Sequence, residues 1–165
     1  MNKLVVLIAI GTASWSCQSP TAPVKSPPSL SEILSEKIPY DSILAAMSGA
    51  DQYGMRKYVI ANLKRGANRS QDSTTAAQLQ RAHLDNINRL AEEGKLVLAG
   101  PFMDDEDVRG IYIFAVETIE EAEALTKTDP SIQAGRLEME LRPWYGSAAL
   151  MFINNLHYST AKEDI

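Results

Sequence analysis

The sequence predicts one α+β domain in which two helices pack on the same face of a four-stranded antiparallel sheet, in the order βαββαβ. Its 165 residues suffice for a single domain with appendages, and 45% of them are hydrophobic, as in ordinary globular proteins. Two segments carry apolar residues at helical spacing, and strand-like segments precede, separate and follow them. This order of elements is the ferredoxin-like split βαβ plan.

The first half of the domain is a strand followed by the longer helix. Residues 58–63 are rich in β-forming types and end at Lys64-Arg65-Gly66, and a polar loop covers residues 68–73. Residues 75–78, Thr-Ala-Ala-Gln, match a capping box and predict a helix that begins there. One stripe at helical spacing follows and ends at a glycine; it consists of Leu79, His83, Ile87, Leu90 and Gly94.

The second half is a hairpin, a shorter helix and a last strand. Residues 96–99 form a short strand that Gly100-Pro101 stops, and residues 109–116 form a longer strand beyond an acidic loop. Residues 118–121, Thr-Ile-Glu-Glu, are a second capping box and open a helix that runs to about Thr128. Residues 136–142 alternate apolar and charged side chains, which predicts the fourth strand.

One face of this sheet lacks helices to cover it. The strand at 111–116 is apolar on both sides, with Ile111, Ile113 and Ala115 opposite Tyr112, Phe114 and Val116. A solvent-exposed sheet surface of that kind is larger than monomers usually tolerate. We therefore expect two copies to pair face to face as a homodimer.

The N-terminus has the pattern of an export signal. A short cationic start is followed by the uncharged, mostly apolar residues 4–13, which are too few for the roughly 20 residues of a membrane-spanning helix. Residues 14–17, Ser-Trp-Ser-Cys, resemble a bacterial lipobox in which Cys17 becomes the lipidated first residue. We expect an envelope protein held on the periplasmic side by this lipid; cleavage to a soluble secreted or periplasmic form is the alternative, because Ser14 and Ser16 also fit the small-x-small rule.

The remaining segments divide the chain into five parts. We expect a signal peptide at 1–16, a tether rich in proline and serine at 17–29, a short helical extension at 30–54, the domain at 55–146 and a C-terminal extension at 147–165. In the helical extension, Pro39 splits an amphipathic stretch at 30–48 into two short helices. Their apolar sides could lie on the domain or on a membrane surface, and packing on the domain is favoured because their polar faces are not basic.

Composition excludes several classes of function. The net charge of −5 disfavours nucleic acid as a partner, and a single cysteine excludes a disulfide framework or a multi-thiolate metal site. The acidic run 104–107 lacks the spacing and glycine of an EF-hand, and His157 with His83 makes too few ligands for zinc or iron. Phosphate loops and nucleophile elbows are missing as well. We therefore expect no metal and no cofactor.

The histidine at position 83 is the best candidate for chemistry. The helical stripe turns His83 toward the sheet, where an aliphatic residue would be usual, and Asp129 follows the second helix on the same face. A carboxylate beside an imidazole selects its tautomer and favours proton transfer near neutral pH. The alternatives are a structural histidine bonded to a backbone carbonyl, and an aspartate that simply ends a helix.

Three stretches, taken in order, resemble the YciI-like (YCII-related domain) family; they are Arg81-Ala82-His83-Leu84, then Glu92-Glu93-Gly94-Lys95-Leu96 with Ala99-Gly100-Pro101, then Thr128-Asp129-Pro130 with Ala134-Gly135-Arg136. The likeness covers about residues 56–146. It implies a dimeric α+β barrel of ferredoxin-like subunits, related to muconolactone-isomerase-like folds, with a His–Asp pair at His83 and Asp129. Most members have no assigned reaction, although the family includes an enzyme of chlorinated-hydroquinone breakdown. The export signal departs from the family pattern.

From residues and resemblance together, we expect a homodimer that binds a small organic molecule, anionic or aromatic, in a cleft between helices and sheet. His83 would act as general acid/base and Asp129 would orient it, with Arg136, Gly100 and Pro101 as ligand contacts. Isomerase, lyase or dehalogenation-like proton transfer fits such a pair. The competing hypothesis is a non-catalytic ligand-binding or envelope interaction module with a structural histidine.

Overall fold

The structure, a computed structural model, describes residues 28–35 and 37–163. The signal peptide, Cys17 and nearly all of the tether lie outside the described residues. The helix α1 belongs to a first unit that ends at Pro39, and all other elements belong to a second unit that begins at Tyr40. The elements are, in chain order, α1 (Leu30–Ser35), α2 (Ser42–Ser48), β1 (Met55–Arg65), α3 (Ser73–Glu92), β2 (Leu96–Pro101), β3 (Val108–Phe114), α4 (Ile119–Thr126), α5 (Pro130–Gln133), β4 (Leu137–Ser147), η1 (Ala148–Phe152) and α6 (Ile153–Thr160).

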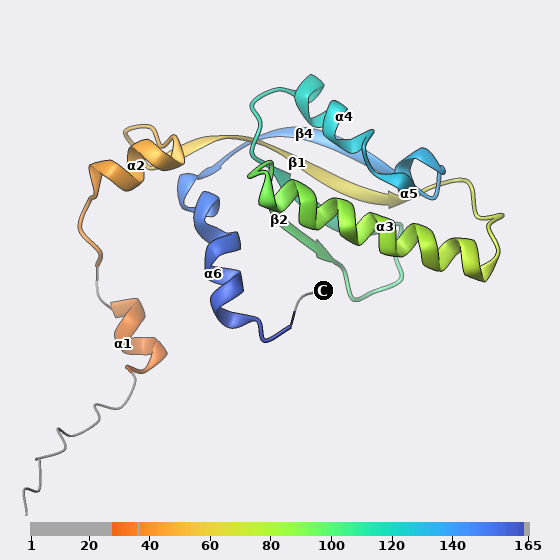
Figure 1. Ribbon diagram of the computed structural model, residues 1–165. Helices are drawn as coiled ribbons and strands as arrows, with labels where there is room; N and C mark the ends of the chain where they lie inside the picture. Colours follow the sequence, from red (N-terminus) through yellow and green to blue (C-terminus); the bar gives the residue numbers. More distant parts are fainter. Residues whose placement is uncertain (1–27, 36, 164–165) are drawn as a thin grey trace, which may run out of the picture. The chain divides into compact units, whose positions relative to one another are not determined.

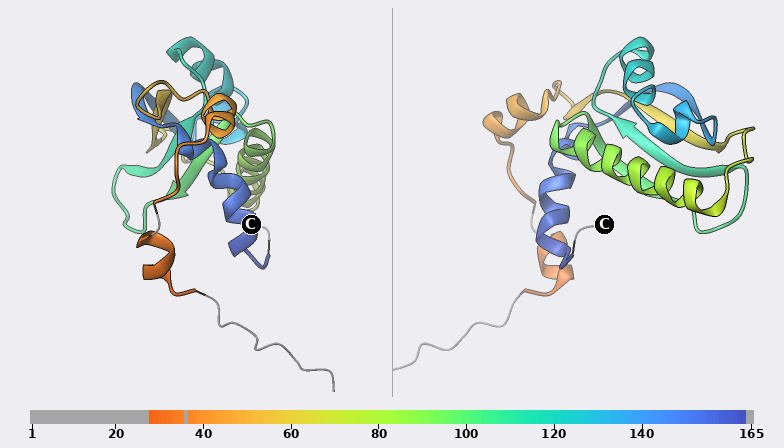
Figure 2. Two further views of the ribbon diagram at one scale, coloured as in Figure 1. Left: turned by 90° about the vertical axis from the view of Figure 1, so that its left-hand side faces the viewer. Right: turned by 45° about the vertical axis from the view of Figure 1, so that its right-hand side comes forward.

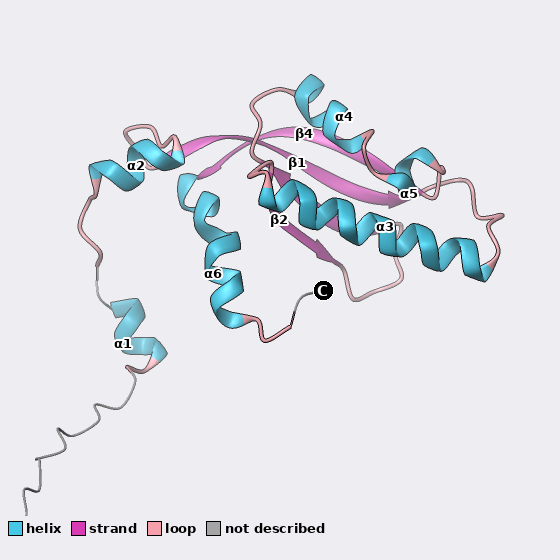
Figure 3. Cartoon of the chain, viewed as in Figure 1, coloured by secondary structure: helices cyan, strands magenta, loops and turns pink. Residues whose placement is uncertain are grey.

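The four strands form one antiparallel sheet in the order β2-β3-β1-β4 (Figures 1 and 3). The helices α3 and α4 lie on the same face of this sheet, as both views in Figure 2 show. The predicted βαββαβ fold is therefore confirmed. The short helix α5 is added between α4 and β4.

The start of α3 and the end of β4 differ from the sequence prediction. The helix α3 begins at Ser73 because the Asp72 carboxylate caps it and accepts from the Thr75 backbone N–H at 2.8 Å, so the capping box predicted at 75–78 is wrong. The second predicted box is confirmed, since Thr118 and Glu121 cap α4 reciprocally. The strand β4 runs on to Ser147 rather than ending at Arg142, because its pairing with β1 continues.

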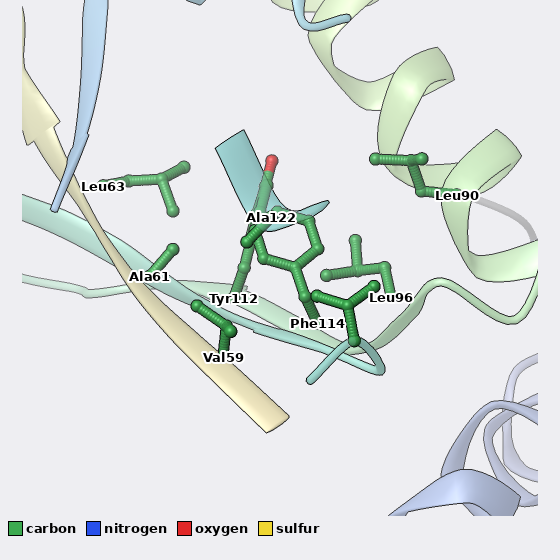
Figure 4. Close-up of a cluster of buried hydrophobic side chains, with 9 residues drawn as sticks. Val59, Ala61, Leu63, Leu90, Leu96, Tyr112, Phe114 and Ala122 are labelled. Atoms are coloured by element: carbon green, nitrogen blue, oxygen red, sulfur yellow. The ribbon is translucent and has the colours of Figure 1, made fainter. Parts of the chain in front are cut away.

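The main core fills the space between the sheet and its helices. Val59, Ala61 and Leu63 of β1 point the same way as Tyr112 and Phe114 of β3, toward α3 (Figure 4). Leu90 of α3 and Ala122 of α4 pack on these side chains from the helix layer. The alternation predicted for residues 111–116 thus holds, with Tyr112, Phe114 and Val116 on the helix side.

The chain itself covers part of the other sheet face. Leu150 and Met151 of η1 pack there on a smaller apolar cluster that contains Tyr58, Val97 and Ile113. Ile60 and Ile111 are only half-buried on the same face. Cover from the C-terminal extension was not predicted, and it leaves a smaller apolar surface open than the sequence suggested.

The two helices predicted around Pro39 are present as α1 and α2. None of the residues of α1 is buried, and in α2 only Ser48 is. The apolar side chains of α2 stay largely exposed, so the expected packing of α2 on the domain is limited to its C-terminal end, where Arg56 donates to the Ser48 carbonyl at 2.9 Å. None of the helices in the described part of the chain has the length and hydropathy needed to cross a membrane.

Candidate functional site

Hydrogen bonds from three successive turns of α3 hold the segment at 128–131, which links α4 to α5. The Ser131 hydroxyl donates to the Leu79 carbonyl at 3.2 Å, and the Thr128 hydroxyl donates to the Asn86 side-chain oxygen at 3.0 Å. Between these two contacts lies His83, whose ring meets Asp129. The segment therefore has a fixed position on α3, and the imidazole and the carboxylate face each other.

The contact between His83 and Asp129 is short and buried. His83 Nδ1 lies 2.6 Å from Asp129 Oδ2, and the two side chains are 8% and 0% exposed. The other carboxylate oxygen, Oδ1, accepts from the Ser131 backbone N–H at 2.8 Å, because Asp129 is the N-cap of α5. Backbone geometry thus orients the carboxylate, and the carboxylate in turn orients the ring.

The second ring nitrogen of His83 faces Tyr112 of β3. The Tyr112 hydroxyl lies 3.3 Å from His83 Nε2, and the two rings stack with centroids 6.1 Å apart. Burial, and then the charge of Asp129, raise the pKa of the Tyr112 phenol, so it stays protonated at all ordinary pH values. Asp129, His83 and Tyr112 therefore form one continuous chain of hydrogen bonds.

These contacts define a consistent arrangement of protons. When Asp129 is ionised and His83 neutral, Nδ1–H donates to the carboxylate and the Tyr112 O–H donates to Nε2. When His83 takes up a second proton, Nε2–H donates to the Tyr112 oxygen instead, and the carboxylate stabilises the imidazolium. In both arrangements each ring nitrogen of His83 keeps a hydrogen-bond partner, whereas the Tyr112 O–H has an acceptor only when Nε2 carries no proton.

The structure places the other predicted site residues at different distances from this chain. Arg136 joins the turn through its backbone, whose N–H donates to the Ser131 carbonyl at 2.9 Å, and its guanidinium donates to Gln71 at 3.3 Å. Gly100 and Pro101 end β2 and pair with Ile111 and Gly110, next to the register position of Tyr112. Neither Gly100 nor Pro101 forms a hydrogen bond with His83 or Asp129. His157 lies on α6, away from it, and Cys17 is outside the described residues.

Sequence reasoning missed Tyr112 and Ser131 as parts of the site. The sequence showed that Tyr112 shares one side of its strand with Phe114 and Val116 but not that this side faces the helices. A buried tyrosine usually needs a partner for its hydroxyl, which was the available signal. For Ser131 the signal was the order Asp129-Pro130, since Asp before Pro at a helix start typically caps the helix and bonds the backbone N–H two residues on.

Sequence and structure comparisons find known proteins that are similar to the domain. The family model of the YCII-related domain matches residues 57–145. The uncharacterized protein YjpA of Bacillus subtilis (strain 168) is 31% identical over 62 residues, which are 38% of this chain and 71% of that protein. Among solved structures, 5-chloro-2-hydroxyhydroquinone dehydrochlorinase from Burkholderia phenoliruptrix AC1100, in complex with 2,5-dihydroxybenzoquinone, is similar with a TM-score of 0.40 and 21% identity, covering 54% of this chain and 93% of that one.

Proposed function

This chain belongs to the family of YCII-related domains, and on that premise we propose that it binds a small organic molecule and transfers a proton on it with His83 and Asp129 as an acid/base pair. The observation that carries the proposal is the 2.6 Å contact between His83 Nδ1 and the fully buried Asp129 carboxylate. A carboxylate in that position keeps the proton on Nδ1, so Nε2 is the basic atom.

The proposed reaction is a proton transfer at carbon or oxygen. His83 Nε2 removes a proton from the bound molecule once a ligand group takes the place of the Tyr112 hydroxyl, and Asp129 stabilises the imidazolium that forms. The proton then returns to another atom of the molecule in an isomerisation, or leaves with the departing group in an elimination. Acyl or phosphoryl transfer is a poorer fit, because the sequence contains neither a nucleophile-elbow motif nor a glycine-rich phosphate loop.

An anionic group on the ligand would suit Arg136. Its backbone is anchored to the turn that carries Asp129, and its guanidinium has only the neutral Gln71 side chain as a hydrogen-bond partner among the described residues. A guanidinium without a carboxylate partner is available for bidentate binding of an organic acid. We therefore propose small aromatic or lactone acids as the ligand class.

We also propose a homodimer that forms through the open face of the sheet. Ile60 and Ile111 remain half-buried there, next to the part that η1 covers. Sedimentation of the full chain at micromolar concentration should show a dimer, and Ile111→Lys should make it a monomer. Gln80→Lys on the exposed side of α3 is the control. A monomeric wild-type chain would contradict this part of the proposal.

For localisation, we propose export and a lipid anchor on Cys17, on the strength of the N-terminal sequence alone. Fractionation of bacterial cells should find the chain with the membranes, and Cys17→Ser should move it to the soluble fraction. A wild-type chain that is soluble in the periplasm would support plain cleavage instead.

A non-catalytic role is the second candidate. It is favoured because every buried side-chain nitrogen and oxygen among the described residues has a hydrogen-bond partner. The buried polar groups therefore need no ligand to satisfy them. In that case the chain would be a ligand-binding or envelope interaction module, and His83 would hold α3 to the 128–131 segment.

Exchange of ligand protons with solvent distinguishes the two candidates. The full chain is mixed in deuterated buffer with a panel of small lactone and aromatic acids, and the loss of acidic C–H signals is followed by NMR. We expect catalysed exchange with the wild type and with His157→Gln, and none with His83→Gln at an unchanged fold. Exchange that persists in His83→Gln, or wild-type and variant chains that differ only in melting temperature, would favour the structural role.

A further inference from the structure

A cleft of about 340 Å³ lies between the C-terminal half of α3, the edge strand β2 and the helix α6. Figure 1 shows α6 beside β2 and near the left-hand end of α3. The family match ends at residue 145 and α6 begins at Ile153, so the family domain supplies only two of the three walls. The cleft is thus a feature that the C-terminal extension of this chain creates.

The walls of the cleft are largely apolar. They include Ile87 and Ala91 of α3, Leu98 of β2 and Ile153 of α6. A volume of this size, with apolar walls and a few polar groups, is typical of small-molecule sites. The cleft contains neither His83 nor Tyr112, so it is a separate site from the His–Asp pair.

The charged groups of the cleft all have the same sign. Glu92 and Glu163 line it, and no lysine or arginine does so within the described part of the chain. Glu92 is also the last residue of α3, where the carbonyl end of the helix adds partial negative charge. The cleft therefore favours a positively charged occupant.

The uncharged polar groups fit the same occupant. Asn154 donates to the Leu96 carbonyl at 2.8 Å, which fixes its amide and leaves its side-chain oxygen as an acceptor. Tyr158 offers an aromatic ring beside His157, with ring centroids 6.3 Å apart. Carboxylates, an amide oxygen and an aromatic face are the groups that hold an ammonium ion.

We propose that this cleft binds a small organic amine, with its ammonium group beside Glu92 and Glu163 and its apolar body against α3 and β2. A bare metal ion suits the cleft less well, because no three histidine, cysteine, aspartate or glutamate side chains come together as metal ligands in the described residues. An aliphatic or aromatic body, by contrast, uses the apolar walls that a metal ion would leave unfilled.

Benzylamine is a suitable probe, with benzyl alcohol and benzoate as neutral and anionic analogues of nearly the same shape. Titrated into the ¹⁵N-labelled full chain, benzylamine should shift the amide signals of Ala91, Leu98 and Asn154. We expect it to bind at least about fivefold more tightly than benzyl alcohol, and benzoate more weakly still, as two partly solvated carboxylates would produce.

Two variants test the assignment of the carboxylates. The double variant Glu92→Gln, Glu163→Gln should weaken benzylamine binding about fivefold and leave benzyl alcohol unaffected. Glu93→Gln removes a neighbouring charge that pairs with Arg89 outside the cleft, and it should leave binding unchanged. Ala91→Phe, which fills the cleft, should abolish binding of all three probes.

The proposal is overturned if benzyl alcohol or benzoate binds as tightly as benzylamine, if the double variant binds benzylamine like the wild type, or if the amide shifts lie outside the cleft. An absence of any shift up to millimolar amine would overturn it as well. These readouts are independent of proton exchange at His83, so this inference and the proposed acid/base function can fail separately.

Discussion

Replacing Asp129 by asparagine is the sharpest test of the His–Asp pair. The carboxylate accepts two hydrogen bonds, from Ser131 N–H at 2.8 Å and from His83 Nδ1 at 2.6 Å. An asparagine can keep its oxygen on Ser131, and it then presents an NH₂ group to Nδ1. Since two donors cannot face each other, the imidazole must move its proton to Nε2. The variant thus changes the tautomer of His83 rather than its position.

Two opposing effects set the size of the stability change. A hydrogen bond to a charged group contributes about 1.5–3 kcal/mol, and the Tyr112 O–H loses its acceptor when Nε2 becomes a donor. Asparagine is uncharged, so the variant no longer buries a charge at this fully buried position, and this gain offsets part of the lost stability. We expect Asp129→Asn to lower the free energy of unfolding by about 2 kcal/mol, which corresponds to a fall in Tm of roughly 5–12 °C.

The effect on chemistry should be larger than the effect on stability. With Nε2 protonated, neutral His83 cannot take a proton, so solvent exchange of ligand protons should fall by at least about a hundredfold. The nitrogen chemical shifts of the imidazole should show the proton moving from Nδ1 to Nε2.

Asp72→Asn is a matched control for this experiment. Asp72 caps α3 as Asp129 caps α5, but it lies at the surface and does not touch His83. Since asparagine and aspartate are about equal as N-caps, it should change neither exchange nor the histidine spectrum. A variant at position 129 with wild-type tautomer and exchange, or with a raised Tm, would refute the reasoning.

Three further predictions concern stability. Glu140→Gln should destabilise the fold at pH 7, because hydrogen bonds from Lys64 and Arg142 lower the pKa of this carboxyl from 4.5 to about 2. The difference should shrink as the pH falls below 4.5 and disappear only below about pH 2; acid unfolding followed by circular dichroism measures it, and a pH-independent difference would contradict it. Gly110→Ala should cost about 1–3 kcal/mol, because its Cβ would come closer than 3.0 Å to the Gly100 carbonyl, whereas Gly100→Ala meets open space and serves as the control; equal Tm values for the two would refute this. Thr118→Ala should lower the free energy of unfolding by about 1 kcal/mol in urea titration by removing the α4 cap, and an unchanged midpoint would count against the capping box.

Periodicity explains why the order of elements could be predicted from the sequence. Each strand and helix has its own repeat of apolar residues, and Thr118 with Glu121 marks a helix start unambiguously. The start of α3 was misplaced because Asp72, a stronger cap than Thr75, lies three residues earlier. The strand β4 was cut short at Pro143, which is tolerated there because β4 is an edge strand.

The site could be predicted only where topology alone determines contact. A helical stripe points His83 inward, and a turn after the second helix of this fold lies on the same face, so the meeting with Asp129 followed from spacing. The contact with Tyr112 depends on which residue of β3 lies under His83, and alternation gives the facing side but not the register. The cleft at α6 depends on how the C-terminal extension packs, for which the sequence contains no periodic signal.

The attachment of the 128–131 segment bears on whether His83 is merely structural. Asn86 and Ser131 already bind this segment to α3 through bonds to Thr128 and to the Leu79 carbonyl. A buried aspartate and histidine add little as a further attachment, because two aliphatic residues of similar volume would be as stable or more so. A buried carboxylate that accepts from a backbone N–H and faces one ring nitrogen determines which nitrogen of the imidazole carries the proton. The burial of Asp129 therefore supports the proposal that His83 transfers a proton.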